Sequence, residues 1–464
     1  MRYFVLLCLS AASLFAAGSL VDAAKAGDKA AIRTMLQQKA DAGATTPDGA
    51  TALHWVAYHD DVESADLLLR AGANVNSAND LGATPLWLAS QNGGSAMVQR
   101  LLAAGANPNL ALLSGETPLM VASRGGYAGV VTQLLAKGAN VNAHGTRGQT
   151  ALMWAVSQQH PEVVKVLLAN KVDVHAKSDV WSEVMAIPPH GYLPYNKNIP
   201  HGGETALMFA ARVGDLDCAK LLLAAGANVN DADAWGVTAV TLAAHSGFTD
   251  LVLYLLDNGA DPNKSDNGFA ALHEGIMRRD EKMIAALLDH RADPNLTLKT
   301  WTPTRRSSDD WNFDPALIGA TPLFMATRFA EPNVMRMLIA KGADTRFVQS
   351  VEYVAEAGFG QEPRKERTTL IMAAAGMGRA GNLWVPYPAR EREVAVLEAV
   401  KLAVELGGDI NATGLDGRTA LDGANQLRMK TVVDFLTEKG AKSTAPAGGG
   451  RGGRGAQPPA APAK

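Results

Sequence analysis

The side chains with the clearest capacity for chemistry are two histidines, His190 and His201, and one acidic pair, Asp309-Asp310. Imidazole and carboxylate groups can ligate a metal ion or exchange protons in a reaction. The chain contains no Walker sequence, no Gly-x-Ser-x-Gly elbow and no paired-cysteine site. The sequence therefore predicts no catalytic residue, no metal ligand and no cofactor. An enzyme or small-molecule binder that uses His190, His201 or the acidic pair is the alternative.

A glycine-rich segment, Gly376-Met377-Gly378-Arg379-Ala380-Gly381, spells the phosphate-binding sequence of dinucleotide-binding proteins. That loop must follow a strand and open a helix. The preceding residues, Thr368 to Ala375, are instead predicted to form a helix. We therefore interpret this glycine spacing as accidental.

Composition excludes further classes of protein. The chain has 464 residues, too many for one ordinary core, and its 47% hydrophobic and 19% charged residues are typical of a folded chain. A net charge of −3 gives no reason to expect nucleic acid or an anionic membrane as partner. Only two cysteines occur, Cys8 and Cys218, so no disulfide framework is expected after a leader is removed. Cys218 is predicted to be a small packing residue.

The two ends of the chain differ in composition from the rest. Residues 1–18 have a basic start, an apolar run and the small residues Ala16-Ala17-Gly18, which together predict a signal peptide. The alternative is a retained amphipathic N-terminus. Residues 441–464 form a Gly/Pro/Ala tail that cannot bury a core. We expect an exported protein, periplasmic or secreted, with a disordered tail.

The elements that must position any site recur every 33 residues in the clearest copies. A threonine, mostly followed by Ala or Pro and then Leu, opens copies at Thr51, Thr84, Thr117, Thr150, Thr205, Thr238, Thr321, Thr368 and Thr419, and a degenerate copy opens at Ala270. The threonine hydroxyl can cap a first helix, and leucines at helical spacing form the buried face of a second helix. One copy cannot bury that face alone, so stacked copies must share one core.

This pattern resembles the ankyrin repeat over residues 22–442. The resemblance implies an all-α repeat solenoid: an ankyrin array of about ten helix-turn-helix copies plus an N-terminal capping repeat, with loop insertions. We expect the repeat domain at 19–440, with copies around 22–43, 48–79, 80–113, 114–146, 147–178, 202–233, 234–266, 267–296, 319–345, 367–412 and 416–440. Insertions are expected at about 178–202, 296–319, 345–367 and 378–393. Long insertions in a regular array are usually functional or disordered.

The fourth position of the family motif Thr-Pro-Leu-His departs from the pattern in most copies. Histidine is present there only as His54 and His273, which we expect to be framework residues. Elsewhere Trp or Met usually takes the position, so apolar packing is expected to replace the hydrogen bonds of the histidine. Glycosylation sequons begin at Asn263, Asn295 and Asn411, but each of these asparagines also closes a repeat, so chance explains the matches.

The insertions are rich in aromatic residues. Those that we select as candidates for partner contact are Trp181, Tyr192, Tyr195, Trp301 and Trp311. Two interpretations stay open, because buried and interface aromatics share this composition. The loops form a ligand or partner surface, or their aromatic side chains only pin each loop onto the solenoid.

The resemblance also implies a concave groove between the first helices and the inter-repeat fingers. It places the ends of the first helices there, including Tyr58, Gln91, Arg124, Arg212, His245 and Arg328. This row has three arginines and no acid. We therefore expect a monomeric, non-enzymatic scaffold that binds a protein or peptide through the groove and the inserted loops, with no membrane insertion after signal cleavage.

Overall fold

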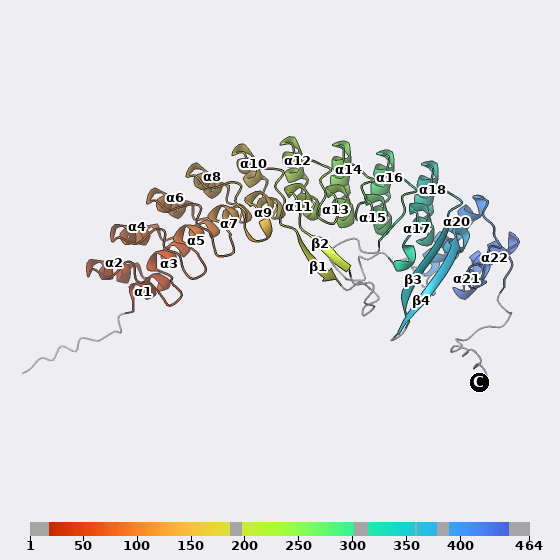
Figure 1. The fold of residues 1–464 in the computed structure, drawn as a ribbon, viewed down its shortest axis with the longest axis horizontal. Coiled ribbons are helices and arrows are strands. Elements are labelled where there is room, and N and C mark those ends of the chain that lie inside the picture. Colours follow the sequence, from red (N-terminus) through yellow and green to blue (C-terminus); the bar gives the residue numbers. More distant parts are fainter. Residues whose placement is uncertain (1–17, 186–196, 301–313, 358–359, 378–388, 445–464) are drawn as a thin grey trace, which may run out of the picture. The chain divides into compact units, whose positions relative to one another are not determined.

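The chain forms two compact units of stacked helix pairs (Figure 1). The computed structural model describes residues 18–185, 197–300, 314–357, 360–377 and 389–444. Unit 1 comprises Met1–Trp181 and Gly202–Asn228, and unit 2 comprises Ser182–His201 and Val229–Lys464. The predicted helical repeat fold is confirmed.

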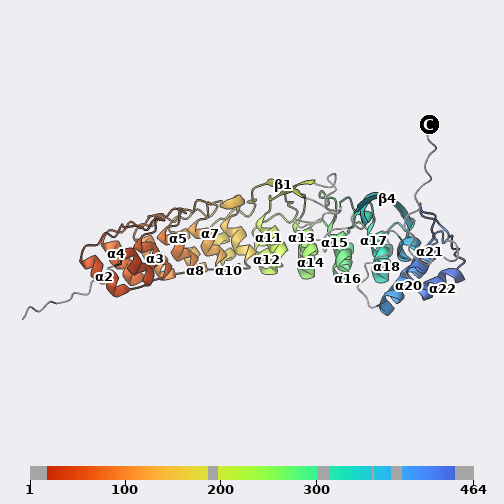
Figure 2. The same cartoon turned by 90° about the horizontal axis from the view of Figure 1, so that it is seen from below.

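Unit 1 contains six helix pairs, in which a short first helix is followed by a second one. The pairs are α1 Leu20–Ala26 and α2 Lys29–Gln37, α3 Ala52–Tyr58 and α4 Val62–Arg70, α5 Pro85–Gln91 and α6 Ser95–Ala103, α7 Pro118–Arg124 and α8 Ala128–Ala136, α9 Ala151–Ser157 and α10 Pro161–Ala169, and α11 Ala206–Val213 and α12 Leu216–Ala224. Each first helix packs against the first helix of the next pair, and each second helix against the next second helix. Figure 2 shows the turns between pairs along one edge of this unit, with α8 and α10 at the opposite edge.

Unit 2 continues the same pairing with larger variations. Its helices are α13 Ala239–Ser246, α14 Thr249–Asp257, α15 Ala271–Arg278, α16 Glu281–Asp289, α17 Pro322–Arg328, α18 Pro332–Ala340, α19 Leu370–Ala374, α20 Ala389–Glu405, α21 Ala420–Gln426 and α22 Lys430–Glu438. Helix α20 has 17 residues where the other second helices of this unit have nine. Part of the segment expected as a fourth loop, 378–393, is therefore helix from Ala389 onward.

Threonine caps explain where the first helices begin. The hydroxyl of Thr84 accepts from the backbone N–H of Trp87 (3.2 Å), and that of Thr117 accepts from Met120 (3.3 Å). Each bond satisfies one of the N–H groups that a helix start leaves unpaired. In the ninth copy the cap is Thr369, which accepts from Met372 (3.4 Å), so this copy begins one residue later than the sequence motif at Thr368 indicates.

The two framework histidines bridge consecutive repeats, as expected. His54 Nδ1 accepts from the backbone N–H of Thr51 (3.0 Å), and its Nε2 lies 2.9 Å from the carbonyl of Ala83 in the next repeat. His273 does the same with Ala270 (3.0 Å) and Leu296 (2.9 Å). Burial lowers the pKa of both, that of His273 to about 4, so both imidazoles are neutral near pH 7 and donate through Nε2.

A chain of asparagines links one repeat end to the next. Asn109 donates from Nδ2 to the carbonyl of Gly138 (2.9 Å) and accepts at Oδ1 from the N–H of Asn140 (2.7 Å). The same two bonds are made by Asn76, Asn230, Asn263, Asn295 and Asn411. All three sequon asparagines therefore have a structural use for the side-chain amide.

The asparagine chain stops at two positions. His175 and Arg346 occupy the places of the linking asparagine. The backbone N–H of His175 donates to Asp173, two residues earlier, and that of Arg346 donates to Asp344 in the same way. Both positions directly precede an insertion that forms strands. Asn295 also precedes an insertion, yet it still bonds to Gly342 (3.0 Å) and Asp344 (2.7 Å). This insertion therefore does not interrupt the hydrogen bonds between the repeats on either side of it.

Two insertions expected as loops contain β-strands. In the first, β1 Trp181–Met185 pairs with β2 Lys197–His201. In the third, β3 Val348–Ala357 and β4 Gly360–Thr369 form an antiparallel pair from Val348↔Thr369 to Ala357↔Gly360. One face of β3, with Gln349, Val351 and Tyr353, is buried, and this two-residue alternation is what makes the segment a half-buried strand.

Small and aliphatic side chains fill the stack. Ala89, Ala122 and Ala155 in successive first helices are fully buried, as are Leu101 and Leu134 in second helices. Cys218 is also fully buried, which confirms it as a packing residue. Among the described residues, no helix is both long and apolar enough to cross a membrane.

Candidate functional site

We call the residues seven positions after each capping residue the helix-end row. It consists of Tyr58, Gln91, Arg124, Ser157 and Arg212 in unit 1, and of His245, Met277 and Arg328 in unit 2. These residues share one register position, at or next to the last turn of a first helix. Their surroundings differ between the two units.

The first two positions of the row are accessible. Tyr58 is 49% exposed, and its ring lies edge-on to Trp55 (centroids 6.4 Å apart) and to His59 (5.4 Å). The ammonium of Lys25 lies 5.2 Å from the centre of the Trp55 ring. Gln91 is exposed at the end of α5. This end of unit 1 thus presents aromatic and amide side chains to solvent.

The arginines of unit 1 are held by acids that the sequence-based row did not include. Arg124 forms an ion pair with Glu116 (2.5 Å), and its guanidinium lies 5.1 Å from the centre of the Trp154 ring. Arg212 pairs with Glu204 and lies 5.7 Å from the centre of the Phe209 ring. Each acid directly precedes the capping threonine of the same repeat. The row itself contains no acid, and the turn before each of these two helices supplies the countercharge.

The inserted aromatics can be placed only in part. Trp181 lies at the start of β1, with the guanidinium of Arg147 4.5 Å from its ring centre. This contact ties Trp181 to the turn of the preceding repeat. Tyr192, Tyr195, Trp301 and Trp311 lie outside the described residues.

In unit 2 the helix-end row is part of a buried set of charges. His245 Nδ1 lies 3.2 Å from Glu274, and Arg278 donates from Nε to the carbonyl of His245 (2.5 Å). Burial lowers the pKa of Arg278. Arg279 pairs with Glu331 (3.2 Å) in the next repeat, and Arg328 is only 7% exposed. His245 and Arg328 therefore serve the interior of the stack more than its surface.

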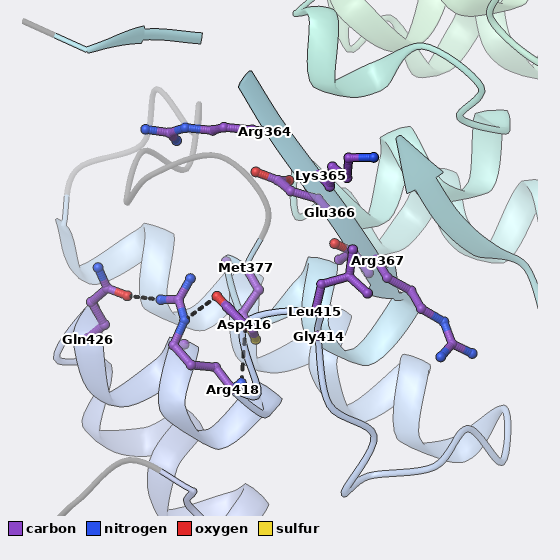
Figure 3. A pocket seen from close by; sticks show the side chains of 13 residues that line it. Arg364, Lys365, Glu366, Arg367, Met377, Gly414, Leu415, Asp416, Arg418 and Gln426 are labelled. Carbon is purple, nitrogen blue, oxygen red and sulfur yellow. Dashed lines mark hydrogen bonds and ion pairs between the residues drawn. The ribbon is translucent and has the colours of Figure 1, made fainter. Parts of the chain in front are cut away.

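A hollow of about 320 Å³ lies where the row reaches the end of unit 2 (Figure 3). Its lining comes from β4, from the end of the first helix of the ninth copy, from the turn at 414–418 and from α21. At the position where unit 1 has Trp55, Trp154 and Phe209, α21 has Gly423. A Cβ atom there would lie 2.5 Å from Met377, so glycine is what lets Met377 pack against this helix.

The charges around the hollow are unevenly matched. Its lining includes four cations, Arg364, Lys365, Arg367 and Arg418, and two acids, Glu366 and Asp416. Both acids are engaged: Asp416 pairs with Arg418 (2.6 Å), and Glu366 accepts from the Tyr353 hydroxyl (2.6 Å). Burial, together with the hydrogen bond to Glu366, raises the pKa of Tyr353, so this hydroxyl remains a donor.

A metal centre has no support in the described part of the chain. Those residues contain no group of three or more His, Cys, Asp or Glu side chains that could hold a metal ion. His201, one of the histidines considered for such a role, is buried at the end of β2. His190 and Asp309-Asp310 lie outside the described residues.

Comparison with family models decides the classification. A model of ankyrin repeats in three copies matches residues 20–111, 87–178 and 207–298, and a model of ankyrin repeats in many copies matches 152–223. Together these matches span more than half of the chain. The chain belongs to the ankyrin repeat family. Ankyrin repeats generally mediate protein–protein interaction, and the fold is typically a binding scaffold without catalytic activity.

Individual relatives match parts of this ankyrin chain. Human BCL-6 corepressor-like protein 1 is 36% identical over 27% of the chain, and a putative ankyrin repeat-containing protein of Treponema pallidum is 38% identical over 20%. The chain spans 7% and 32% of the length of these two relatives. Among solved structures, the human ASB11 ankyrin repeat domain has 27% identity and a TM-score of 0.44, and the alignment covers 53% of this chain and 99% of that domain.

Ankyrin register explains which site residues the sequence located and which it missed. The helix-end row follows from the spacing after each threonine. Glu116 and Glu204 could have been found by the same register, because each stands eight residues before an arginine of the row. The hollow gave no comparable signal, since it depends on β4, whose segment was expected to be a loop.

Proposed function

We propose that this ankyrin protein is a non-enzymatic scaffold that binds a protein or peptide through the helix-end row of unit 1 and through its inserted segments. The observations that carry this proposal are the exposed Tyr58, whose ring lies edge-on to Trp55, and the exposed Gln91 at the same register position of the next repeat. Aromatic side chains that are exposed at the end of a rigid helix offer large contact area at low entropic cost. The family property of protein binding supports the same function.

Arg124 and Arg212 contribute to this surface through their packing more than through net charge. Each guanidinium covers an aromatic ring and is neutralised by a glutamate of its own repeat. A partner therefore meets guanidinium groups that lie over aromatic rings and offer hydrogen-bond donors. Such a surface favours specific contact with a protein over unspecific attraction of anions.

The experiment is capture of partners by the immobilised mature chain from an extract of its own host, followed by mass spectrometry. Two variants are compared with the wild type: the double variant Tyr58→Ala/Gln91→Ala, and Lys137→Ala, which removes an exposed side chain beside α8. The double variant is expected to weaken capture by about 2 kcal/mol, the effect of losing one aromatic hot spot. Equal capture by both variants would contradict the role of the row.

We also propose that the protein acts outside the cytoplasm. The apolar run and the Ala16-Ala17-Gly18 sequence support cleavage by a signal peptidase. N-terminal sequencing of the protein from its own host is expected to begin near residue 19. Recovery of the intact N-terminus from the cytoplasm would refute export.

A further inference from the structure

The hollow in unit 2 has the chemistry of a binding site for a carboxylate. We propose that it takes an acidic segment of a partner protein, with a carboxylate beside an apolar side chain. The proposal rests on the proposed function, because it names a second recognition site of the same scaffold and the chemical class that this site accepts.

The first argument is the charge that is left over. Asp416 and Glu366 already accept from Arg418 and the Tyr353 hydroxyl, and Lys365 pairs with Glu352 (2.6 Å). Arg364, in contrast, lies 3.9 Å from the carboxylate of Glu362, which is a loose ion pair. For the side chain of Arg367, the described residues supply no hydrogen bond and no ion pair. Because Arg367 extends to the other face of β4, Arg364 is the cation without a close acid on the face that it shares with Glu366, and an anionic ligand would complement it.

The second argument is the direction of the donors. Along β4, side chains alternate between the two faces of the strand, so Arg364 and Glu366 extend to one side and Lys365 and Arg367 to the other, as Figure 3 shows. Across the hollow, Arg418 donates to Oε1 of Gln426 (2.6 Å). This bond orients the Gln426 amide, and its Nε2 has no acceptor within the described part of the chain. A carboxylate in the hollow can accept from Arg364 and from this amide.

The third argument favours a peptide over a small free anion. Leu415 lies on the rim, 62% exposed, although it is a large apolar residue in a turn that also supplies the charged lining. A volume of about 320 Å³ exceeds what one carboxylate fills. An apolar side chain next to an acidic one would cover Leu415 while its neighbour reaches Arg364. This combination belongs to a polypeptide and not to an inorganic ion.

The test is fluorescence anisotropy of the full chain with two labelled peptide amides, Gly-Glu-Leu-Glu-Gly and Gly-Gln-Leu-Gln-Gly. We expect saturable binding of the glutamate peptide and weaker binding of the glutamine peptide by about tenfold or more. The variant Arg364→Gln should lose about tenfold in affinity for the glutamate peptide. Leu415→Ser should weaken both peptides. The matched control Arg346→Gln, at an exposed arginine of unit 2 outside the hollow, should bind as the wild type does.

Each other result counts against the site. Equal binding of both peptides, no binding of either, or an equal loss in Arg346→Gln and Arg364→Gln would overturn the proposal. Sodium acetate is compared with unlabelled peptide as a competitor. If both displace the labelled glutamate peptide at the same concentration, the hollow is a simple anion site and the choice of a peptide is overturned. Circular dichroism of each variant verifies folding. If Arg364→Gln does not fold, the effect of Leu415→Ser on peptide binding tests the site instead.

The outcome is separable from that of the proposed function. Loss of partner capture in Tyr58→Ala/Gln91→Ala, with unchanged peptide binding in Arg364→Gln, would leave the scaffold role standing and remove only the hollow. Conversely, Arg364→Gln could weaken peptide binding while Tyr58→Ala/Gln91→Ala captures partners as the wild type does. That result would support the peptide site in the hollow and contradict the role of the helix-end row.

Discussion

The same register position serves different purposes in the two units. In unit 1 the charged members of the helix-end row pair within their own repeat, as Arg124 does with Glu116. In unit 2 the row member His245 of the sixth copy pairs with Glu274 of the seventh. Beside the row, Arg279 of the seventh copy pairs with Glu331 of the eighth. A charge that is satisfied locally leaves the surface available for contact. A charge that is satisfied by the neighbouring repeat becomes part of the stack.

Exposure, and not residue type, therefore decides whether a residue of the row is available to a partner or holds neighbouring repeats together. Of the row members, Arg124 keeps 35% of its side chain exposed, whereas the side chain of His245 keeps 16%. A buried charge that loses its partner pays the full cost of desolvation. The two units should therefore respond unequally to equivalent substitutions.

The largest effect is expected from removing a buried acid. Glu274→Ala leaves His245 and the nearby arginines without this carboxylate and should lower the free energy of unfolding by about 3–5 kcal/mol. Glu116→Ala breaks a partly buried pair at the surface and should cost about 1 kcal/mol. Urea denaturation, followed by circular dichroism, measures both. Equal losses would show that the two rows are equivalent and would break the comparison.

The next effect concerns the histidines that bridge repeats. The pKa of His273 is lowered from 6.5 to about 4, so the unfolded chain takes up a proton that the fold excludes. Stability is fully present above pH 6.5 and declines as the pH falls towards 4, by about 3 kcal/mol for this residue. The variant His273→Gln should flatten that decline.

His54 provides the counterpart in unit 1. Its pKa is lowered by the same burial, so His54→Gln should also reduce the loss of stability as the pH falls below 6.5. Thermal unfolding at a series of pH values distinguishes the two variants. A wild-type stability that does not change between pH 6.5 and 4 would contradict both assignments.

A smaller effect is expected in the asparagine chain of unit 1. Asn109→Ala removes two hydrogen bonds to the next repeat and should lower stability by about 1–2 kcal/mol. Asn142 makes one such bond in the structure, to the N–H of Asp173 (2.8 Å), so Asn142→Ala should cost less. Urea midpoints in the reverse order would show that these bonds do not determine the cohesion of the repeats.

The smallest effect is a gain at the break in unit 2. Arg346 stands where the chain of asparagines would continue, and its side chain is exposed. If the following repeat keeps its acceptor in place, Arg346→Asn should add about 1 kcal/mol. Differential scanning calorimetry measures the gain. A loss of stability would show that the hairpin β3–β4 has moved the acceptor out of reach.

Most of the stack was predictable, because it depends on local signals that repeat. The threonine before each first helix, the alanines within it and the leucines of the second helix are sufficient to place Thr84, Ala89 and Leu101. The predicted helix start was wrong by one residue at Thr368-Thr369, where two adjacent threonines compete for the cap: β4 runs through both of them, and the second one caps the helix.

The insertions and the site were less predictable, since their structure depends on contacts outside the repeat period. Val351 and Tyr353 alternate with polar residues, a strand signal that the aromatic content of the segment obscured. The hollow requires β4 and Gly423 together, and these lie more than 50 residues apart in the sequence. The pairing of Arg212 with Glu204 has a signal in the register, because the glutamate directly precedes the threonine that opens the repeat.

Asn295 joins its repeat to Gly342 and Asp344 although an insertion intervenes. The entropy of closing a loop rises by only about 0.6 kcal/mol when its length doubles, so the number of inserted residues has little influence on the stack. In evolutionary terms, this boundary lets the protein acquire or exchange a segment without compensating mutations in the repeats. The inserted segment and the repeats that carry it can then change at different rates.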